Sequence, residues 1–253
     1  MDAIRFVRNR MLLPIIFLLL FAAAFIFDSP REIFDGYLNI LQSPSVLISD
    51  YLRIGGFGAT LFNVATILFF NVLLLKKLGF KMTGPIFAGA FTIAGFSFFG
   101  KNIFNTLPIY LGIYLYARTQ KLDYKSFIIV VLFSTGISPL VSFLIFGTGW
   151  SYWMGVPIGI LAGVIVGFIL PSFSQHTIRF HRGYNLYNIG FALGVLSMLA
   201  AVILHAFHID LDVGGPSSQA YHLELVFICL GISILFIFSS FIMDKDVIKK
   251  YPK

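Results

Sequence analysis

The 253-residue chain is strongly apolar: hydrophobic residues make up 58% of it, charged residues 11%, and the mean hydropathy is +0.91. These values exclude an ordinary soluble domain and are typical of a helical membrane protein. The net charge of +7 does not indicate nucleic-acid binding, because the basic residues stand in loops between apolar runs, where they orient membrane helices. The single cysteine, Cys229, excludes an internal disulfide.

Apolar runs near the length that spans a bilayer, about 20 residues, follow one another along the chain. The first has arginines before its apolar core but no convincing signal-peptidase site, so we interpret it as a retained helix. The predicted fold is a single membrane domain of the all-α class, with re-entrant or broken helices as an option. It has eight membrane-spanning helices, at about 11–27, 56–75, 83–100, 103–117, 126–146, 153–173, 184–206 and 222–243.

The longest stretch between these runs, residues 28–55, is not a simple loop. From Ser45 to Ile54 its polar and apolar residues alternate at helical spacing. This pattern predicts an amphipathic helix at the outer membrane interface.

The basic residues indicate how the helices are oriented. If the N-terminus is cytoplasmic, the eight spans place all 18 Lys and Arg residues on the inner side except Arg31, Arg53 and Lys101. Such a bias predicts a multi-pass protein of the cell (plasma) membrane with both termini in the cytoplasm. An odd number of crossings would remove the bias.

The phrase G-x-x-L-[F/Y]-N occurs twice, from Gly58 to Asn63 and from Gly183 to Asn188. Each copy opens an apolar span, and by the charge argument the two spans cross in opposite directions. This is the pattern of an inverted-topology repeat, which is used chiefly to move solutes across membranes. The predicted parts are a first repeat at 43–147, a connecting helix at 148–173 and an incomplete second repeat at 174–253.

The connecting helix has a glycine at every fourth position: Gly155, Gly159, Gly163 and Gly167. This spacing places the glycines on one helix face, where another backbone can approach closely. The pattern therefore predicts tight helix packing and, by itself, no function.

The stretch 91–109 interrupts two apolar runs with polar and helix-breaking residues: Gly100, Lys101, Asn102, Asn105 and Pro108. A cation and carboxamides are costly near the bilayer core unless they face protein or water. Glycine and proline can interrupt helices, and the freed backbone groups are what transporters present to solutes. One interpretation is a solute-facing break; the alternative is a tight extracellular turn with Lys101 reaching the lipid head groups.

Asparagines also lie in or at the ends of the apolar spans, at Asn63, Asn71, Asn185 and Asn188. A carboxamide donates and accepts hydrogen bonds, so it either binds a polar solute or bridges helices. Repeat symmetry would bring Asn63 and Asn188 toward one axis. The candidates for a solute path are therefore Asn63, Lys101, Asn102, Asn105, Pro108, Asn185 and Asn188.

Signatures of metal sites and enzymes are missing from the sequence. His205, His208, Asp210 and Asp212 cluster at the outer end of the seventh span, but their spacing matches no recognised zinc pattern. Nucleophile elbows, H-E-x-x-H and phosphate-binding loops do not occur. We therefore expect no cofactor, no metal and no enzymatic activity.

Four phrases together resemble one known family: S-P-S-V-L-I-S-D-Y (43–51), G-A-T-L-F-N (58–63), G-F-S-F-F-G-K-N-I-F-N-T-L-P-I (95–109) and H-R-G-Y-N-L-Y-N-I-G-F (181–191). It is the domain-of-unknown-function family 1576, a set of prokaryotic integral membrane proteins built from repeated halves. The resemblance covers most of residues 40–200, and G-K-N-x-x-N-x-x-P is its most specific part. It implies a polytopic membrane protein and supplies no activity, substrate or functional residue.

The family pattern also implies a second G-x-x-x-x-G-K-x-x-N-x-x-P segment after the second phrase, which this sequence lacks. The chain is then a fragment, one half of a split protein with a partner chain, or a homo-oligomer that supplies the site twice. The leading hypothesis is a transporter or channel for a small polar solute. The alternative is a non-transporting membrane subunit that scaffolds or regulates a partner. The expected partners are the lipid bilayer and the solute, not nucleic acid.

Overall fold

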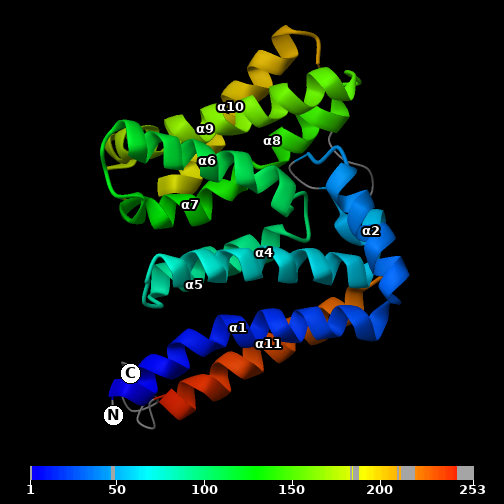
Figure 1. Cartoon of the computed structure of the whole chain (residues 1–253), viewed down its shortest axis with the longest axis vertical. Coiled ribbons are helices and arrows are strands. Elements are labelled where there is room, and N and C mark those ends of the chain that lie inside the picture. The colour runs from blue at the N-terminus through cyan, green and yellow to red at the C-terminus, as the bar shows by residue number, and fades with distance from the viewer. Residues whose placement is uncertain are drawn as a thin grey trace.

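The computed structural model (Figure 1) describes residues 2–46, 49–182, 184, 188–209, 211 and 220–243, with side chains from Leu13 to Phe238 within these ranges. In this part of the chain every regular element is a helix, which confirms the all-α class. The elements are α1 (Asp2–Phe27), α2 (Pro30–Gln42), α3 (Tyr51–Gly55), α4 (Phe57–Lys77), α5 (Gly84–Phe96), α6 (Ile103–Thr119), η1 (Tyr124–Phe127), α7 (Ile128–Ser134), η2 (Thr135–Ile137), α8 (Pro139–Ser142), η3 (Phe143–Gly147), α9 (Tyr152–His181), α10 (Asn188–Ala206) and α11 (His222–Met243).

Three of these helices, α4, α9 and α10, are long and apolar enough to cross a membrane. Two bent pairs pass the same test: α1 with α2, bent by 113°, and Tyr124–Ile137 with Pro139–Gly147, bent by 44°. Counting each pair as one span gives up to five, and α5 and α11 contain shorter apolar helices. The chain is therefore a multi-pass membrane protein. Each of the eight apolar runs expected from the sequence coincides with a helix or a broken helical segment.

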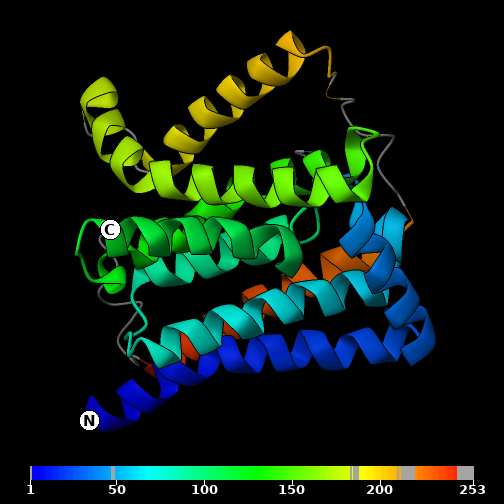
Figure 2. The same ribbon diagram turned by 45° about the horizontal axis from the view of Figure 1, so that its top comes forward.

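Two large apolar clusters hold most of the helices, whose arrangement Figures 1 and 2 show, together. One joins α1, α4 and α5, and α11 packs against it, with Tyr221 stacked on Phe57 at 5.1 Å between ring centroids. The other joins α6, α7, α9 and α10 to the inner faces of α4 and α5. The helices run across the molecule in alternating directions, so the α4–α5 connection, the α6–η1 connection and the end of α9 lie on the side where α1 begins.

The amphipathic helix expected near residues 45–54 lies earlier in the chain, so this prediction is wrong in position. The helix is α2, whose first turn is fixed by a capping box: Ser29 Oγ accepts from the Glu32 amide at 3.4 Å, and the Glu32 carboxylate accepts from the Ser29 amide at 2.8 Å. It ends before Pro44, which lacks an amide hydrogen and disfavours helix at the preceding residue. Residues 44–46 and 49 after it are not helical, and Asp50 caps the short α3.

The first copy of the repeated phrase marks a close contact between α1 and α4. The Gly58 amide donates to Asp28 Oδ2 at 2.6 Å, and a Cβ at Gly58 would lie 2.7 Å from the carbonyl oxygen of Ala24. Glycine is therefore needed for the approach of the two backbones. Most of the second copy, Gly183 and residues 185–187, lies outside the described residues.

The glycine ladder of α9 packs as expected. A Cβ at Gly155 would lie 2.7 Å from the Ile145 carbonyl oxygen, and one at Gly167 would overlap the backbone of Ile109 in α6. Gly112 of α6 lies opposite, against the backbone of α9. The ladder thus binds α6 and η3 within the same chain. Since α9 continues to His181, the expected boundary at residue 173 falls inside this helix.

Candidate functional site

The break between α5 and α6 lies inside the protein. α5 has 13 residues, or about 20 Å of helix, against roughly 30 Å for the apolar core of a bilayer. The chain turns at Gly100, whose φ is +84° and whose Cβ would lie 2.8 Å from the Val46 carbonyl oxygen, so only glycine fits. Lys101 follows and is 1% exposed. The alternative in which Lys101 extends to the head groups is therefore wrong.

A second break interrupts the helical segment from 124 to 147. After α7 the chain tightens into the 3₁₀ turn η2, restarts as α8 and widens into the π-helix η3. Gly136 is a poor helix former, and Pro139 cannot donate to the carbonyl of Thr135, which accepts from the Ser138 amide instead. The polar residues along this break are all fully buried: Ser134, Thr135, Ser138 and Ser142.

Side chains from the first break reach the second. Lys101 Nζ donates to Thr135 Oγ1 at 2.5 Å and lies 5.1 Å from the ring centroid of Phe96. Asn105 Nδ2 donates to Ser142 Oγ and to the Gly100 carbonyl, each at 2.9 Å. The structure therefore brings together two of the sequence-predicted residues with hydroxyls that lie more than thirty positions further along the chain.

Asn63 of α4 closes the site from a third side. Its Nδ2 donates to the carbonyl oxygens of Ser97 and Lys101, at 2.8 and 2.9 Å. Both carbonyls are freed by the end of α5, so a carboxamide here satisfies backbone that no helix can satisfy. Asn63 Oδ1 is buried and has no hydrogen-bond partner. We call Asn63, Lys101, Asn105, Thr135 and Ser142 the polar cluster.

Asn102 connects the polar cluster to a covering segment. Its Oδ1 accepts from the Asn105 amide and Asn105 Oδ1 accepts from the Asn102 amide, each at 3.0 Å, which caps α6. Asn102 Nδ2 donates to Tyr51 Oη at 3.1 Å, and Tyr51 Oη pairs with Ser45 Oγ at 2.9 Å. The Tyr51 amide also donates to the Phe98 carbonyl at 3.2 Å. Residues 43–46 and 49–51, the cover segment, therefore close over the break.

The remaining candidates lie elsewhere or serve packing. Pro108 is buried within α6, which continues through it and packs on Gly163 of the ladder. Asn188 ties α10 to α9: its Nδ2 donates to the Ser174 carbonyl at 2.6 Å, and its Oδ1 accepts from Thr177 at 2.8 Å. Asn63 and Asn188 thus have separate partners on different helices.

Asn185 lies outside the described residues. Asn71 of α4 accepts from Tyr110 Oη of α6 at 2.8 Å and donates to the Ile67 carbonyl at 2.9 Å, so it bridges two helices. It is buried like Asn63 but does not touch the polar cluster.

The charge of Lys101 has no counter-charge in the described part of the chain. An ion pair in that part joins Arg31 and Asp35, which are exposed, whereas Lys101 contacts a hydroxyl and an aromatic ring. The same residues contain no cluster of His, Cys, Asp and Glu able to hold a metal. Asp210 and Asp212 of the sequence-predicted cluster lie outside them.

The sequence reasoning missed Thr135, Ser138 and Ser142. The available signal was a row of hydroxyl residues at spacings of three and four within one apolar run, beside Gly136 and Pro139. Such a row lies along one helix face. Together with the glycine and the proline it indicates a broken segment with a polar side.

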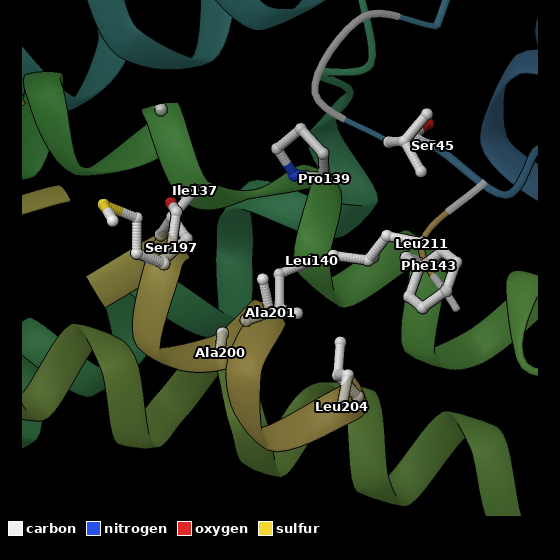
Figure 3. A pocket seen from close by; sticks show the side chains of 13 residues that line it. Ser45, Ile137, Pro139, Leu140, Phe143, Ser197, Ala200, Ala201, Leu204 and Leu211 are labelled. Carbon is white, nitrogen blue, oxygen red and sulfur yellow. The ribbon is translucent and has the colours of Figure 1, made fainter. Parts of the chain in front are cut away.

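A cavity of about 360 Å³ lies on another side of the second break, between it and α10 (Figure 3). Its walls are mostly apolar side chains, including Leu140, Phe143 and Leu204, and its hydroxyl groups come from Ser45 and Ser197. It supplies few groups for a polar solute, so the polar cluster is the better candidate site.

Residues 29–206, more than half of the chain, match the family described as Protein of unknown function (DUF1576). The chain belongs to this family. The match includes both breaks and the polar cluster and ends with α10. No curated protein and no solved structure matches the chain.

Proposed function

We propose that this family member is a transporter or channel for a small polar solute. The observation that supports this most is the polar cluster, because it lies where two interrupted segments meet among apolar helices. Membrane proteins tolerate non-helical backbone at this depth only where it is buried in protein or lines a water-filled path. In transporters, such interruptions present freed backbone and polar side chains to the solute.

The proposed topology has eight crossings of the plasma membrane, with both termini in the cytoplasm. Exposed basic residues lie on the side where α1 begins (Figures 1 and 2): Lys81 and Lys121 in connections and Arg179 in the last turn of α9. An excess of positive charge favours the cytoplasmic side. On this assignment the cover segment faces the outside of the cell.

An inverted repeat remains part of the proposal. In Figures 1 and 2, α4 and α10 run in opposite directions across the molecule, as the two halves of such a repeat would. A structure of the remaining residues of the second phrase would test it by superposition of 56–75 on 184–206. A homo-oligomer or a partner chain that supplies the missing half fits the same proposal.

Solute access requires a second conformation. Lys101, Asn102 and Asn105 are fully buried here, and the hydrogen bond from Asn102 to Tyr51 holds the cover segment in place. We therefore take this structure as the closed state. Movement of the cover segment would expose the polar cluster to the outside while α9 and α6 stay packed. The proposal includes no catalytic step.

The test is uptake of a complex metabolite mixture by proteoliposomes that contain the purified full chain, with protein-free liposomes as baseline. We expect at least one small polar solute to enter faster with the protein. Uptake equal to the baseline for all solutes, with the protein shown to be folded and inserted, would contradict the proposal. A membrane subunit without transport activity would then be the better account.

A further inference from the structure

The Lys101 ammonium could bind a ligand, because the described residues do not use all of its hydrogen-bond donors. An ammonium group has three hydrogen-bond donors. One is used by Thr135 Oγ1, and the ring of Phe96 faces the group at 5.1 Å. The described residues provide no carboxylate for it, although the side chain is fully buried. A buried cation without an anion is costly, so an anionic partner would stabilise this arrangement.

A second buried group without a hydrogen-bond partner lies in the second break. Ser138 Oγ is inaccessible to solvent and makes no hydrogen bond. Ser138 follows Thr135 by three positions across the 3₁₀ turn η2, a spacing at which side chains eclipse one another. The Ser138 hydroxyl therefore lies on the side of the segment that holds Thr135, the partner of Lys101. A hydroxyl is a suitable donor to an anion.

We propose that the solute is a small monovalent anion, bound between the Lys101 ammonium and the Ser138 hydroxyl. This inference rests on the proposed transport function and narrows its substrate class. One cation balances one negative charge, and a divalent anion would leave a buried excess charge. A cationic solute would place like charges together in an apolar environment.

The experiment uses the full chain in proteoliposomes and compares size-matched anionic and neutral probes, formate against formamide and nitrate against urea. Binding is measured in parallel as the shift of the heat-unfolding midpoint in detergent, with gluconate replacing the probe anion at constant ionic strength. We expect the anions to move faster than their neutral counterparts and to raise the midpoint in a saturable manner.

Variants connect the effect to the site. Lys101→Met should reduce anion binding and flux by about tenfold or more, as expected for loss of a charged hydrogen bond. Ser138→Ala removes a hydroxyl that has no protein partner, so it should fold normally and still weaken anion binding. Lys125→Met, at an exposed position, is the matched control and should change neither measurement. If Lys101→Met does not fold, the effect of Ser138→Ala and the comparison of anionic with neutral probes on the wild-type protein still test the proposed anion site.

The outcomes separate this inference from the transport proposal. Flux of formamide or urea without anion flux or binding would overturn the anion assignment and leave transport standing. Anion binding that depends on Lys101 without flux of any solute would keep the site and contradict transport. Binding and flux of anions that Lys101→Met and Ser138→Ala leave unchanged would overturn the proposed site.

Discussion

The ammonium of Lys101 donates a hydrogen bond to the hydroxyl of Thr135, and this contact joins the two interrupted segments of the protein. Lys101 lies in the break between α5 and α6, and Thr135 begins the 3₁₀ turn after α7. Interrupted backbone and a buried charge are each costly in an apolar environment. Their meeting at one place is difficult to explain by stability alone and favours a functional role.

Replacement of Lys101 by methionine should stabilise the protein. Methionine nearly matches the apolar stem of lysine but removes a buried charge that lacks a counter-charge. We expect a gain of about 1–3 kcal/mol in the free energy of unfolding. It would be measured as a higher unfolding midpoint in detergent. Thr135 keeps its hydrogen bond to the Leu132 carbonyl in this variant. A clearly lower midpoint would show that the lysine is held for structural reasons.

The glycine ladder gives a test of the α6–α9 packing. Gly167→Ala places a methyl group into the backbone of Ile109, so the helices must separate. We expect a loss of about 1–3 kcal/mol and a reduced yield of folded protein. Gly194→Ala in α10 is the matched control, because nothing lies within 4 Å of its added carbon. Equal midpoints for the two variants would contradict the packing described here.

The positions of the long apolar helices, though not all of their ends, could be predicted from the sequence because apolar runs, charged connections and glycine spacing are local signals. The 153–173 run became the core of α9, with its four glycines on the face that meets α6, α8 and η3. The position of α2 was missed because its decisive signals were the caps: Ser29 with Glu32 at the start and Pro44 after the end. Hydrophobic alternation near residue 50 was the misleading signal.

Only one half of the site, the residues around Lys101 and Asn105, could be predicted from the sequence. The polar residues around Lys101 and Asn105 stand out in the sequence because they interrupt an apolar run. Their partners, Thr135 and Ser142, were not, since hydroxyl residues are common in membrane helices and nothing local shows which helix they face. The pairing of Asn63 with Asn188 assumed that symmetry brings equal residues together. Instead each satisfies nearby backbone carbonyls.

Locking the cover segment should stop transport. Asp50 and Phe99 form an isolated antiparallel bridge, and residues paired in this way are close enough for a disulfide. In a Cys229→Ser background, Asp50→Cys with Phe99→Cys should lose flux under oxidising conditions and regain it with a reductant. Each single cysteine variant is the control, and neither should respond to reductant. Unchanged flux with the disulfide formed would show that solutes do not need this segment to move.

The proposed topology gives a labelling test. In the Cys229→Ser background, Arg31→Cys should react with an impermeant thiol reagent added to intact cells, because the Arg31 side chain is highly exposed in the first turn of α2. A cysteine at Lys121, in the exposed α6–η1 connection, should react only after the membrane is opened. The opposite pattern would place both termini outside the cell.

The most direct test of the central claim compares two buried asparagines of the same helix. Asn63 belongs to the polar cluster, and its Oδ1 has no hydrogen-bond partner. In Asn71, by contrast, Oδ1 accepts from Tyr110 Oη and Nδ2 donates to a backbone carbonyl of α4. Leucine has the same branching and the same number of side-chain heavy atoms as asparagine, but it cannot donate to the Ser97 and Lys101 carbonyls, so it would no longer hold the break that positions Lys101. Uptake of the identified solute is measured per folded protein in proteoliposomes. Asn63→Leu should abolish it while Asn71→Leu retains most of it. Equal uptake by both variants would contradict a solute path through the polar cluster.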